Sequence, residues 1–183
     1  MDKFKILIVD DVSENLFTLR LLLEDSFDNL DILEALTVEK ALNLVRKNDI
    51  DLILTDIQMP DAGGFDLSKN LLEIDKGKDV PIIMITGIYD DDLYRKLAYK
   101  SSKNVIDYIV KPIDDEIFNS KLTRYIELFK NRKKDKLELE NKEKQLKEEQ
   151  EINSFLDNVQ IKDKDLENIE ISDIIDDIKM KED

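Results

Sequence analysis

The chain has 183 residues, of which 42% are hydrophobic and 39% are charged, and it contains neither cysteine nor histidine. Without these residue types it can form no disulfide, thiolate metal site or phosphohistidine of its own. The formal net charge of −15 at pH 7 predicts no binding to nucleic acid and none to an anionic membrane surface. No apolar run is long enough to cross a bilayer and the N-terminus lacks the pattern of a signal peptide, so we expect a cytoplasmic protein.

Glycine, proline and charge are distributed unevenly and divide the chain into three parts. All four glycines and all three prolines lie before residue 113, whereas the later residues are mostly charged and carry no such turn signals. We predict a compact domain over residues 3–126, a charged helical or coiled-coil extension over residues 127–150, and an acidic tail over residues 151–183.

Five short apolar runs in the first part have the length and the β-branched content of strands. They are Phe4–Val9, Leu30–Leu33, Asp51–Thr55, Val80–Ile85 and Val105–Val110. Four of these runs are apolar without alternation, which is expected of parallel strands that are covered on both faces.

Segments with a helical period follow each of these runs. Their apolar positions are Leu16, Leu19, Leu22 and Leu23, with Ser13 as N-cap; Ala41, Leu42 and Val45, with Thr37 as N-cap; Leu67, Leu71 and Leu72; Leu93 and Leu97; and Ile113, Ile117, Leu122, Tyr125 and Phe129. Five strand–helix repeats predict an α/β fold with a parallel, doubly wound sheet.

The predicted strands end in residues that suit a ligand site. The first strand is followed by Asp10 and Asp11, the third by Asp56, the fourth by Thr86 and the fifth by Lys111. Ligands in such sheets bind beyond the carboxyl ends of the strands, so these side chains should converge. Three carboxylates without histidine or cysteine favour Mg²⁺ or Mn²⁺, and a lysine beside them can bind a phosphate group. A carboxylate can also be phosphorylated, so the constellation suits a metal-assisted phosphoryl acceptor.

Four spaced segments resemble the receiver domain of two-component response regulators. They are Ile6–Asp11, Leu54–Pro60, Ile85–Gly87 and Tyr108–Pro112, and the resemblance extends over about residues 3–126. It implies a flavodoxin-like sheet with strand order 2-1-3-4-5. It also implies a signalling switch that phosphorylates itself from a donor rather than a turnover enzyme.

The resemblance assigns a role to each acidic residue. Asp56 would accept the phosphoryl group from a partner histidine kinase or histidine phosphotransfer protein. Asp11, Asp56 and the backbone carbonyl of Gln58 would bind Mg²⁺ directly, and Asp10 would bind it through water. A phosphatase of related fold would have a second acid at Gln58, and its absence argues against that alternative.

The resemblance also assigns the switch residues. Thr86 would hydrogen-bond the phosphoryl group, Lys111 would pair with it, and Tyr108 would move inward behind Thr86. The peptide bond between Lys111 and Pro112 would be cis. An aromatic residue in a strand is also an ordinary core residue, which is the alternative for Tyr108.

The helical pattern continues past the expected end of the domain. A heptad frame runs through Phe118, Leu122, Tyr125, Phe129, Leu139 and Leu146, but Arg132, Lys136 and Glu143 occupy its other positions. Three i,i+4 pairs support the helix: Glu138–Lys142, Glu140–Lys144 and Glu143–Lys147. The extension is either a parallel dimeric coiled coil, giving a homodimer, or a solvated single helix.

Two apolar groups with helical spacing lie in the acidic tail: Ile152, Phe155, Leu156 and Val159, and then Ile171, Ile174, Ile175 and Ile178. They would dock on the domain, on a second copy or on a partner, or the tail stays disordered until it binds. We expect a phosphoacceptor without a DNA-binding or enzymatic output domain. The alternatives are the input fragment of a larger hybrid kinase or cyclic-dinucleotide regulator, and a coiled-coil scaffold that works without phosphorylation.

Overall fold

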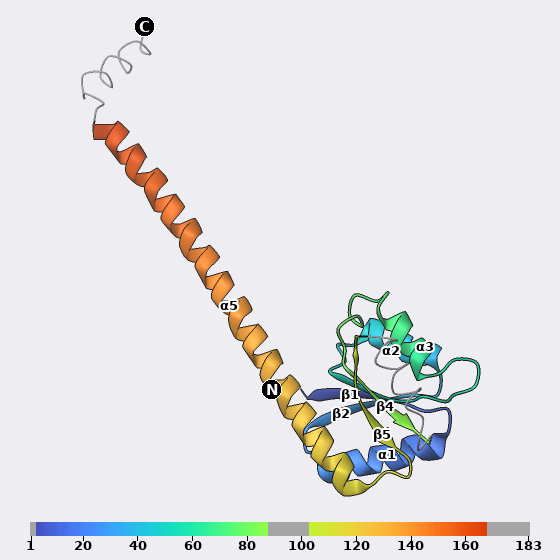
Figure 1. The fold of residues 1–183 in the computed structure, drawn as a ribbon. Helices are drawn as coiled ribbons and strands as arrows, with labels where there is room; N and C mark the ends of the chain where they lie inside the picture. Colours follow the sequence, from blue (N-terminus) through green and yellow to red (C-terminus); the bar gives the residue numbers. More distant parts are fainter. Residues whose placement is uncertain (1–2, 88–102, 168–183) are drawn as a thin grey trace. The chain divides into compact units, whose positions relative to one another are not determined.

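The computed structural model describes residues 3–87 and 103–167, and it contains a five-stranded parallel sheet (Figure 1). Its strands are β1 (Phe4–Val9), β2 (Leu30–Ala35), β3 (Leu52–Asp56), β4 (Ile82–Thr86) and β5 (Val105–Val110). They lie in the order β2-β1-β3-β4-β5, which confirms the predicted fold class. The predicted helix through Leu93 and Leu97 and the tail group that begins at Ile171 lie outside the described residues.

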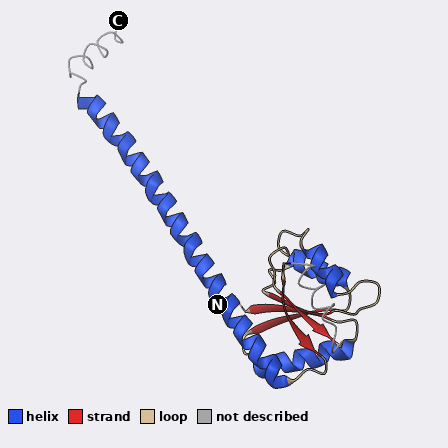
Figure 2. Cartoon of the chain, in the orientation of Figure 1, coloured by secondary structure: helices blue, strands red, loops and turns tan. Residues whose placement is uncertain are grey.

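Helices cover both faces of the sheet, as the coloured cartoon shows (Figure 2). They are α1 (Ser13–Ser26), α2 (Val38–Lys47), α3 (Gly64–Leu71) and α5 (Asp115–Glu167). One buried cluster joins the sheet to α2 and α3, and a second joins it to α1 and the first turns of α5. Successive β1 residues alternate between the clusters, with Leu7 in the first and Ile8 in the second. This two-sided burial explains the continuous apolarity of the central strands.

One predicted N-cap is confirmed and the other is wrong. The Thr37 hydroxyl accepts the N–H of Lys40 at 3.2 Å and begins α2 as expected. Ser13 is instead the first residue of α1 and does not cap it. The chain turns sharply before α1 because the Asp10 carboxylate accepts the Val12 N–H at 2.9 Å. The helix therefore begins one residue earlier than the cap assignment required.

The long helix α5 takes part in two compact units, Met1–Lys130 and Asn131–Asp183. The Asp114 carboxylate accepts the N–H of Ile117 at 2.9 Å near the start of α5. Phe118 and Leu122 are completely buried in the first unit, and Tyr125 stacks on Phe129 with ring centroids 6.2 Å apart. The first four positions of the heptad frame therefore contribute to the core of this unit.

The second unit has an exposed, highly charged helix surface. Leu139 and Leu146 are 58% and 55% exposed, and the tail residues Ile152 and Phe155 belong to the same helix and are also exposed. Ion pairs run from a lysine to the glutamate four residues later: Lys134–Glu138, Lys136–Glu140 and Lys144–Glu148, at 3.8–3.9 Å. The predicted glutamate-first pairs are not among the ion pairs of this part of the structure. None of the helices in the described ranges is long and apolar enough to cross a membrane.

Two adjacent residues of α5 test how its first turns face the sheet. Phe118→Ala should lower the free energy of unfolding by about 3–5 kcal/mol because it empties a fully buried position. Ile117→Ala, at a side chain that is 56% exposed, should change it by about 0.5 kcal/mol or less. Urea denaturation followed by circular dichroism measures both, and equal losses in the two variants would contradict this orientation of the helix.

Candidate functional site

Three carboxylates meet at the carboxyl edge of the sheet. Asp10 and Asp11 follow β1 and Asp56 ends β3, and these two strands are neighbours with Val9 paired to Thr55. One carboxylate oxygen from each of the three aspartates lies within 4.8 Å of the others. Asp11 is the most exposed of the three, and Asp10 is almost completely buried. The parallel arrangement thus brings the sequence-predicted acids to one point.

The Asp10 carboxylate accepts hydrogen bonds from three neighbours. The backbone N–H of Val12 donates to Oδ1 at 2.9 Å and Lys111 Nζ donates to Oδ2 at 3.0 Å. Nδ2 of Asn15 donates to Oδ1 at 2.9 Å and to Oδ2 at 3.0 Å. Sequence reasoning missed Asn15. Its position in the first turn of α1, five residues after Asp10, is the only signal that would have indicated it.

Asp56 is held in a similar way, although its side chain keeps 12% of its surface exposed. The backbone N–H of Gln58 donates to Oδ1 at 3.2 Å, and Lys111 Nζ donates to Oδ2 at 2.8 Å. The predicted ligand residue Gln58 therefore lies beside the carboxylates, in the turn that leaves β3. One lysine joins the two buried aspartates.

Lys111 reaches this position from the loop after β5. Its backbone N–H donates to the carbonyl of Thr86 at 2.7 Å, and its peptide bond to Pro112 is cis, as the resemblance implied. Burial alone would lower the pKa of the Lys111 ammonium group. Hydrogen bonds and charge attraction from Asp56 and Asp10 outweigh that effect and raise the pKa above its ordinary value. Lys111 is therefore protonated throughout the physiological pH range.

The two predicted switch residues lie at different depths. Thr86 ends β4, is buried, and is paired with Val110 in the adjacent strand. Tyr108 lies farther back on β5, opposite Met84, and its half-buried side chain packs against the cluster under α2 and α3. Tyr108 is thus a core-contacting residue in this structure.

Gly63 and Gly64 lie close to the backbone of Asp56 and Ile57. The N–H of Gly64 donates to the carbonyl of Ile57 at 3.2 Å, so the chain doubles back directly after the acidic residue. A Cβ atom on Gly63 would lie 2.1 Å from that same carbonyl oxygen, and one on Gly64 would lie 2.7 Å from the carbonyl oxygen of Asp56. Only glycine fits these two positions, which sequence reasoning did not single out.

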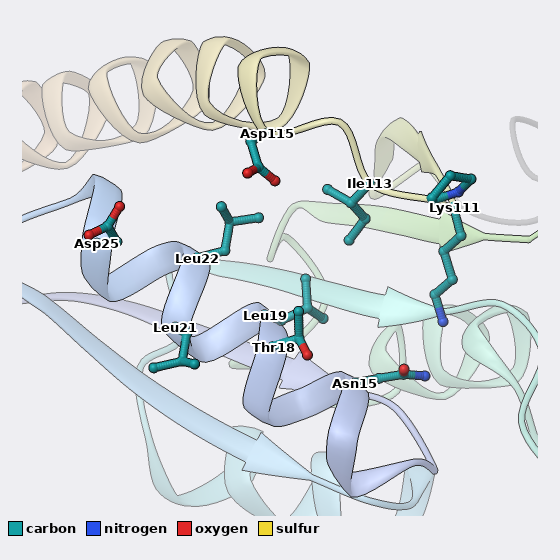
Figure 3. Close-up of a pocket in the computed structure, with 10 residues that line it drawn as sticks. Asn15, Thr18, Leu19, Leu21, Leu22, Asp25, Lys111, Ile113 and Asp115 are labelled. Carbon is teal, nitrogen blue, oxygen red and sulfur yellow. The ribbon is translucent and has the colours of Figure 1, made fainter.

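A groove of about 650 Å³ adjoins the site between α1 and the start of α5. Figure 3 shows Lys111 and Asn15 at one end of it and Asp25 and Asp115 toward the other. The intervening wall is mostly apolar and includes Leu22, with Thr18 as a polar member. One end of the groove is therefore formed by two residues, Asn15 and Lys111, that bond the Asp10 carboxylate.

The chemistry of the donors fits a hard divalent cation. Carboxylate oxygens, supplemented by a backbone carbonyl and water, are the ligands that Mg²⁺ and Mn²⁺ prefer. The three clustered aspartates supply such oxygens within the reach of one ion. Lys111 adds the positive charge that a bound phosphate group needs.

Comparison with known proteins shows what this chain is similar to. Residues 6–123 match the family model of the response regulator receiver domain. The chain is 33% identical over 135 residues to the sensory transduction protein LytT of Bacillus anthracis, an alignment that covers 74% of this chain and 50% of LytT. It is 35% identical over 124 residues to the chemotaxis protein CheY-3 of Vibrio cholerae, covering 67% of this chain and 92% of CheY-3.

Solved structures show the same fold. One is the receiver domain of a sensor histidine kinase from Pseudomonas aeruginosa, described with a magnesium ion coordinated in the active site cleft. It matches 68% of this chain and 98% of its own length with a TM-score of 0.59 and 22% identity. Among the curated relatives, the alignment spans nearly all of CheY-3 but only half of LytT.

A pair of glycine variants tests the turn behind Asp56. Gly63→Ala should destabilise the protein by about 1–3 kcal/mol, because the new Cβ collides with a backbone oxygen that can move only with the turn. Gly87→Ala, where nothing lies within 4 Å of the added Cβ, should change stability by about 0.5 kcal/mol or less. Chemical denaturation of both variants decides the point, and a Gly63→Ala protein as stable as the parent would refute the close approach.

Proposed function

The chain belongs to the response regulator receiver domain family, and we propose that it accepts a phosphoryl group on Asp56 from a partner histidine kinase or histidine phosphotransfer protein. One observation carries this proposal. Asp56 lies at the carboxyl end of the central strand β3, its carboxylate is clustered with those of Asp10 and Asp11, and the ammonium group of Lys111 bonds it at 2.8 Å. A phosphoryl acceptor needs a nucleophilic carboxylate together with positive charge.

In the proposed reaction, one oxygen of the Asp56 carboxylate attacks the phosphorus atom of the partner's phosphohistidine. An O–P bond forms as the N–P bond breaks, and the electron pair of the broken bond goes to the released ring nitrogen. The histidine leaves as neutral imidazole because its other ring nitrogen carries the proton. Lys111 keeps the charge of the transferred group balanced, because its ammonium already bonds Asp56 Oδ2. Water then hydrolyses the acyl phosphate slowly, so the protein acts as a switch.

Asp11, Asp56 and the backbone carbonyl of Gln58 are the proposed ligands of Mg²⁺, for which Mn²⁺ can substitute, and Asp10 is the proposed ligand through water. The ion would supply positive charge that offsets the repulsion between the carboxylates and the incoming phosphoryl group. The magnesium ion in the active site cleft of the Pseudomonas receiver domain, which has the same fold, supports this assignment.

Thr86 and Tyr108 are the proposed output residues. The Thr86 hydroxyl would bond the new phosphoryl oxygens, and Tyr108 would follow it inward. Two observations support this pairing: the strands that carry these residues are hydrogen-bonded neighbours, and the Thr86 carbonyl already holds the backbone of Lys111. A movement of Thr86 toward the phosphoryl group would therefore act directly on β5.

The groove beside Lys111 is where we place the partner. A phosphohistidine must come within bonding distance of Asp56, so the partner has to cover the carboxyl edge of the sheet. Leu21 lines the groove and is 49% exposed, and Val12 and Phe17 of the same region are 42% and 62% exposed outside it. Exposed apolar surface of this kind is what a helical partner can bury. Binding at α1 would leave Tyr108 uncovered, because Tyr108 packs on the face of the sheet that α2 and α3 cover.

We also propose that the exposed part of α5 forms a weak homodimer through Leu139 and Leu146. The two leucines are seven residues apart, so they lie on one stripe of the helix, and both are more than half exposed. Joining two copies along this stripe is the simplest way to remove both leucines from water.

Incubation with acetyl phosphate and Mg²⁺ tests the phosphoacceptor. Intact mass spectrometry should show one added phosphoryl group on the parent chain and none on Asp56→Asn, because the amide is not a nucleophilic carboxylate. Chelation of the metal with EDTA should abolish the adduct. A phosphorylated Asp56→Asn chain would place the acceptor elsewhere, and a parent chain phosphorylated equally well in EDTA would remove the metal from the proposal.

Light scattering tests the dimer. The parent chain should show a concentration-dependent mass that exceeds that of a monomer, and Leu139→Asp with Leu146→Asp should reduce it to the monomer mass because like charges would replace the apolar seam positions. Leu137→Asp is the matched control, since Leu137 is 58% exposed on the same helix but outside the stripe. A monomeric parent chain at every concentration, or equal loss in the control, would rule out the interface.

A further inference from the structure

Among the described residues, Asn15 is the donor that reaches both oxygens of the Asp10 carboxylate. Its Nδ2 lies 2.9 Å from Oδ1 and 3.0 Å from Oδ2, so one N–H is shared between them, and Val12 and Lys111 each bond a single oxygen. With 1% exposure, Asp10 has no room to replace lost donors with bulk water. A substitution at Asn15 therefore changes the hydrogen bonding of the Asp10 carboxylate.

We propose that Asn15 is a positioning residue for the metal site, which it serves by fixing the direction in which Asp10 presents its charge. The inference rests on the proposed function, because the proposed ion lies among Asp10, Asp11 and Asp56. It adds a residue that lies outside the cluster of acids, on the first turn of α1. It also gives this turn of α1 a role in cation affinity.

The neutral amide does something that Lys111 cannot do. Lys111 bonds Oδ2 of both Asp10 and Asp56 with a single ammonium group, so it draws the two carboxylates toward itself and cancels part of their charge. Asn15 donates from α1 and carries no charge, so it orients Asp10 without reducing the negative charge that attracts a cation. Without Asn15, the Val12 N–H on Oδ1 would be left to oppose the pull of the ammonium group on Asp10, and the ammonium group would compete with the ion for the Asp10 oxygens.

A purely local role for Asn15 predicts different contacts. Asparagine at the start of a helix ordinarily bonds the helix backbone, and here the Asn15 amide bonds the carboxylate instead while the Val12 N–H is already bonded to Asp10. Residues that orient a metal ligand without touching the metal typically contribute a factor of about 10–100 to metal affinity. We expect an effect of that kind, at the lower end because two other donors remain.

Calorimetric titration of the full chain with MgCl₂ alone tests the inference without any phosphoryl donor. Asn15→Ala and the similarly sized Asn15→Leu should each raise the Kd for Mg²⁺ by about 10-fold. Asn43→Ala should leave it unchanged, since Asn43 is an exposed asparagine of α2 whose side chain bonds Arg46. A thermal unfolding midpoint for every variant shows that it is folded.

A second measurement separates positioning from a general loss of activity. In the acetyl phosphate reaction, the Mg²⁺ concentration that gives half the maximal rate should rise by the same factor in both Asn15 variants. The rate at saturating Mg²⁺ should stay within about twofold of the parent rate, as expected when only ground-state metal binding is weakened.

The outcomes are distinguishable. Parental Mg²⁺ affinity in both Asn15 variants overturns the inference and leaves the proposed function standing. Weakened binding in Asn15→Ala but not in Asn15→Leu also overturns it, because filled volume rather than hydrogen bonding would then be sufficient. A parent chain that neither binds Mg²⁺ nor becomes phosphorylated would overturn the proposed function, and the inference with it.

Discussion

The site depends on one ammonium group between two buried carboxylates. Asp10 and Asp56 are close, and in a protein interior their repulsion is screened far less than in water. Lys111 compensates for it by bonding one oxygen of each aspartate, at 3.0 and 2.8 Å. Removing one partner from such a buried arrangement typically costs about 3–5 kcal/mol, because the remaining charge is left uncompensated. The fold therefore has to place the Lys111 side chain accurately.

Lys111 is placed by the edge strand β5, which it follows directly. Asp10 follows β1 and Asp56 ends β3, so Lys111 must reach across the end of β4, and the Thr86 carbonyl fixes its backbone at that crossing. At the outer side of β5, the N–H of Tyr108 bonds the Asp107 carboxylate at 2.8 Å and its carbonyl accepts Lys121 Nζ of α5 at 2.8 Å. Side chains thus occupy polar groups that an edge strand would otherwise offer to another strand. The first turns of α5 hold the strand that carries the site lysine.

Much of this could be predicted because parallel strands end at a common edge. Once the apolar runs were assigned, Asp10, Asp56 and Lys111 had to meet there, whatever the details of the helices. Asn15 and Gly63 could not be found in this way, since their roles depend on how α1 is rotated about its axis and on which carbonyl the turn after β3 approaches. The predicted Ser13 cap was wrong for a related reason. The carboxylate of Asp10, a site residue, accepts the Val12 N–H in the turn before α1. The ion pairs on α5 were not predictable either, since exposed pairs differ by only a few tenths of a kcal/mol.

Burial of apolar residues in the sheet-containing unit also limits how tightly α5 can form a dimer. The heptad frame has six apolar positions, but Phe118 and Leu122 are buried in the sheet-containing unit, and Tyr125 and Phe129 pack against the same cluster. Only Leu139 and Leu146 of the frame are left for a second copy, with Glu143 between them.

Coiled coils owe their stability mainly to consecutive apolar layers, so an interface with two leucine layers separated by a charge must be weak. A weak interface is more sensitive to changes elsewhere in the chain than a strong one, because a small free energy is then enough to shift the monomer–dimer equilibrium. The core of the receiver domain therefore sets an upper limit on how tightly the helix it anchors can self-associate.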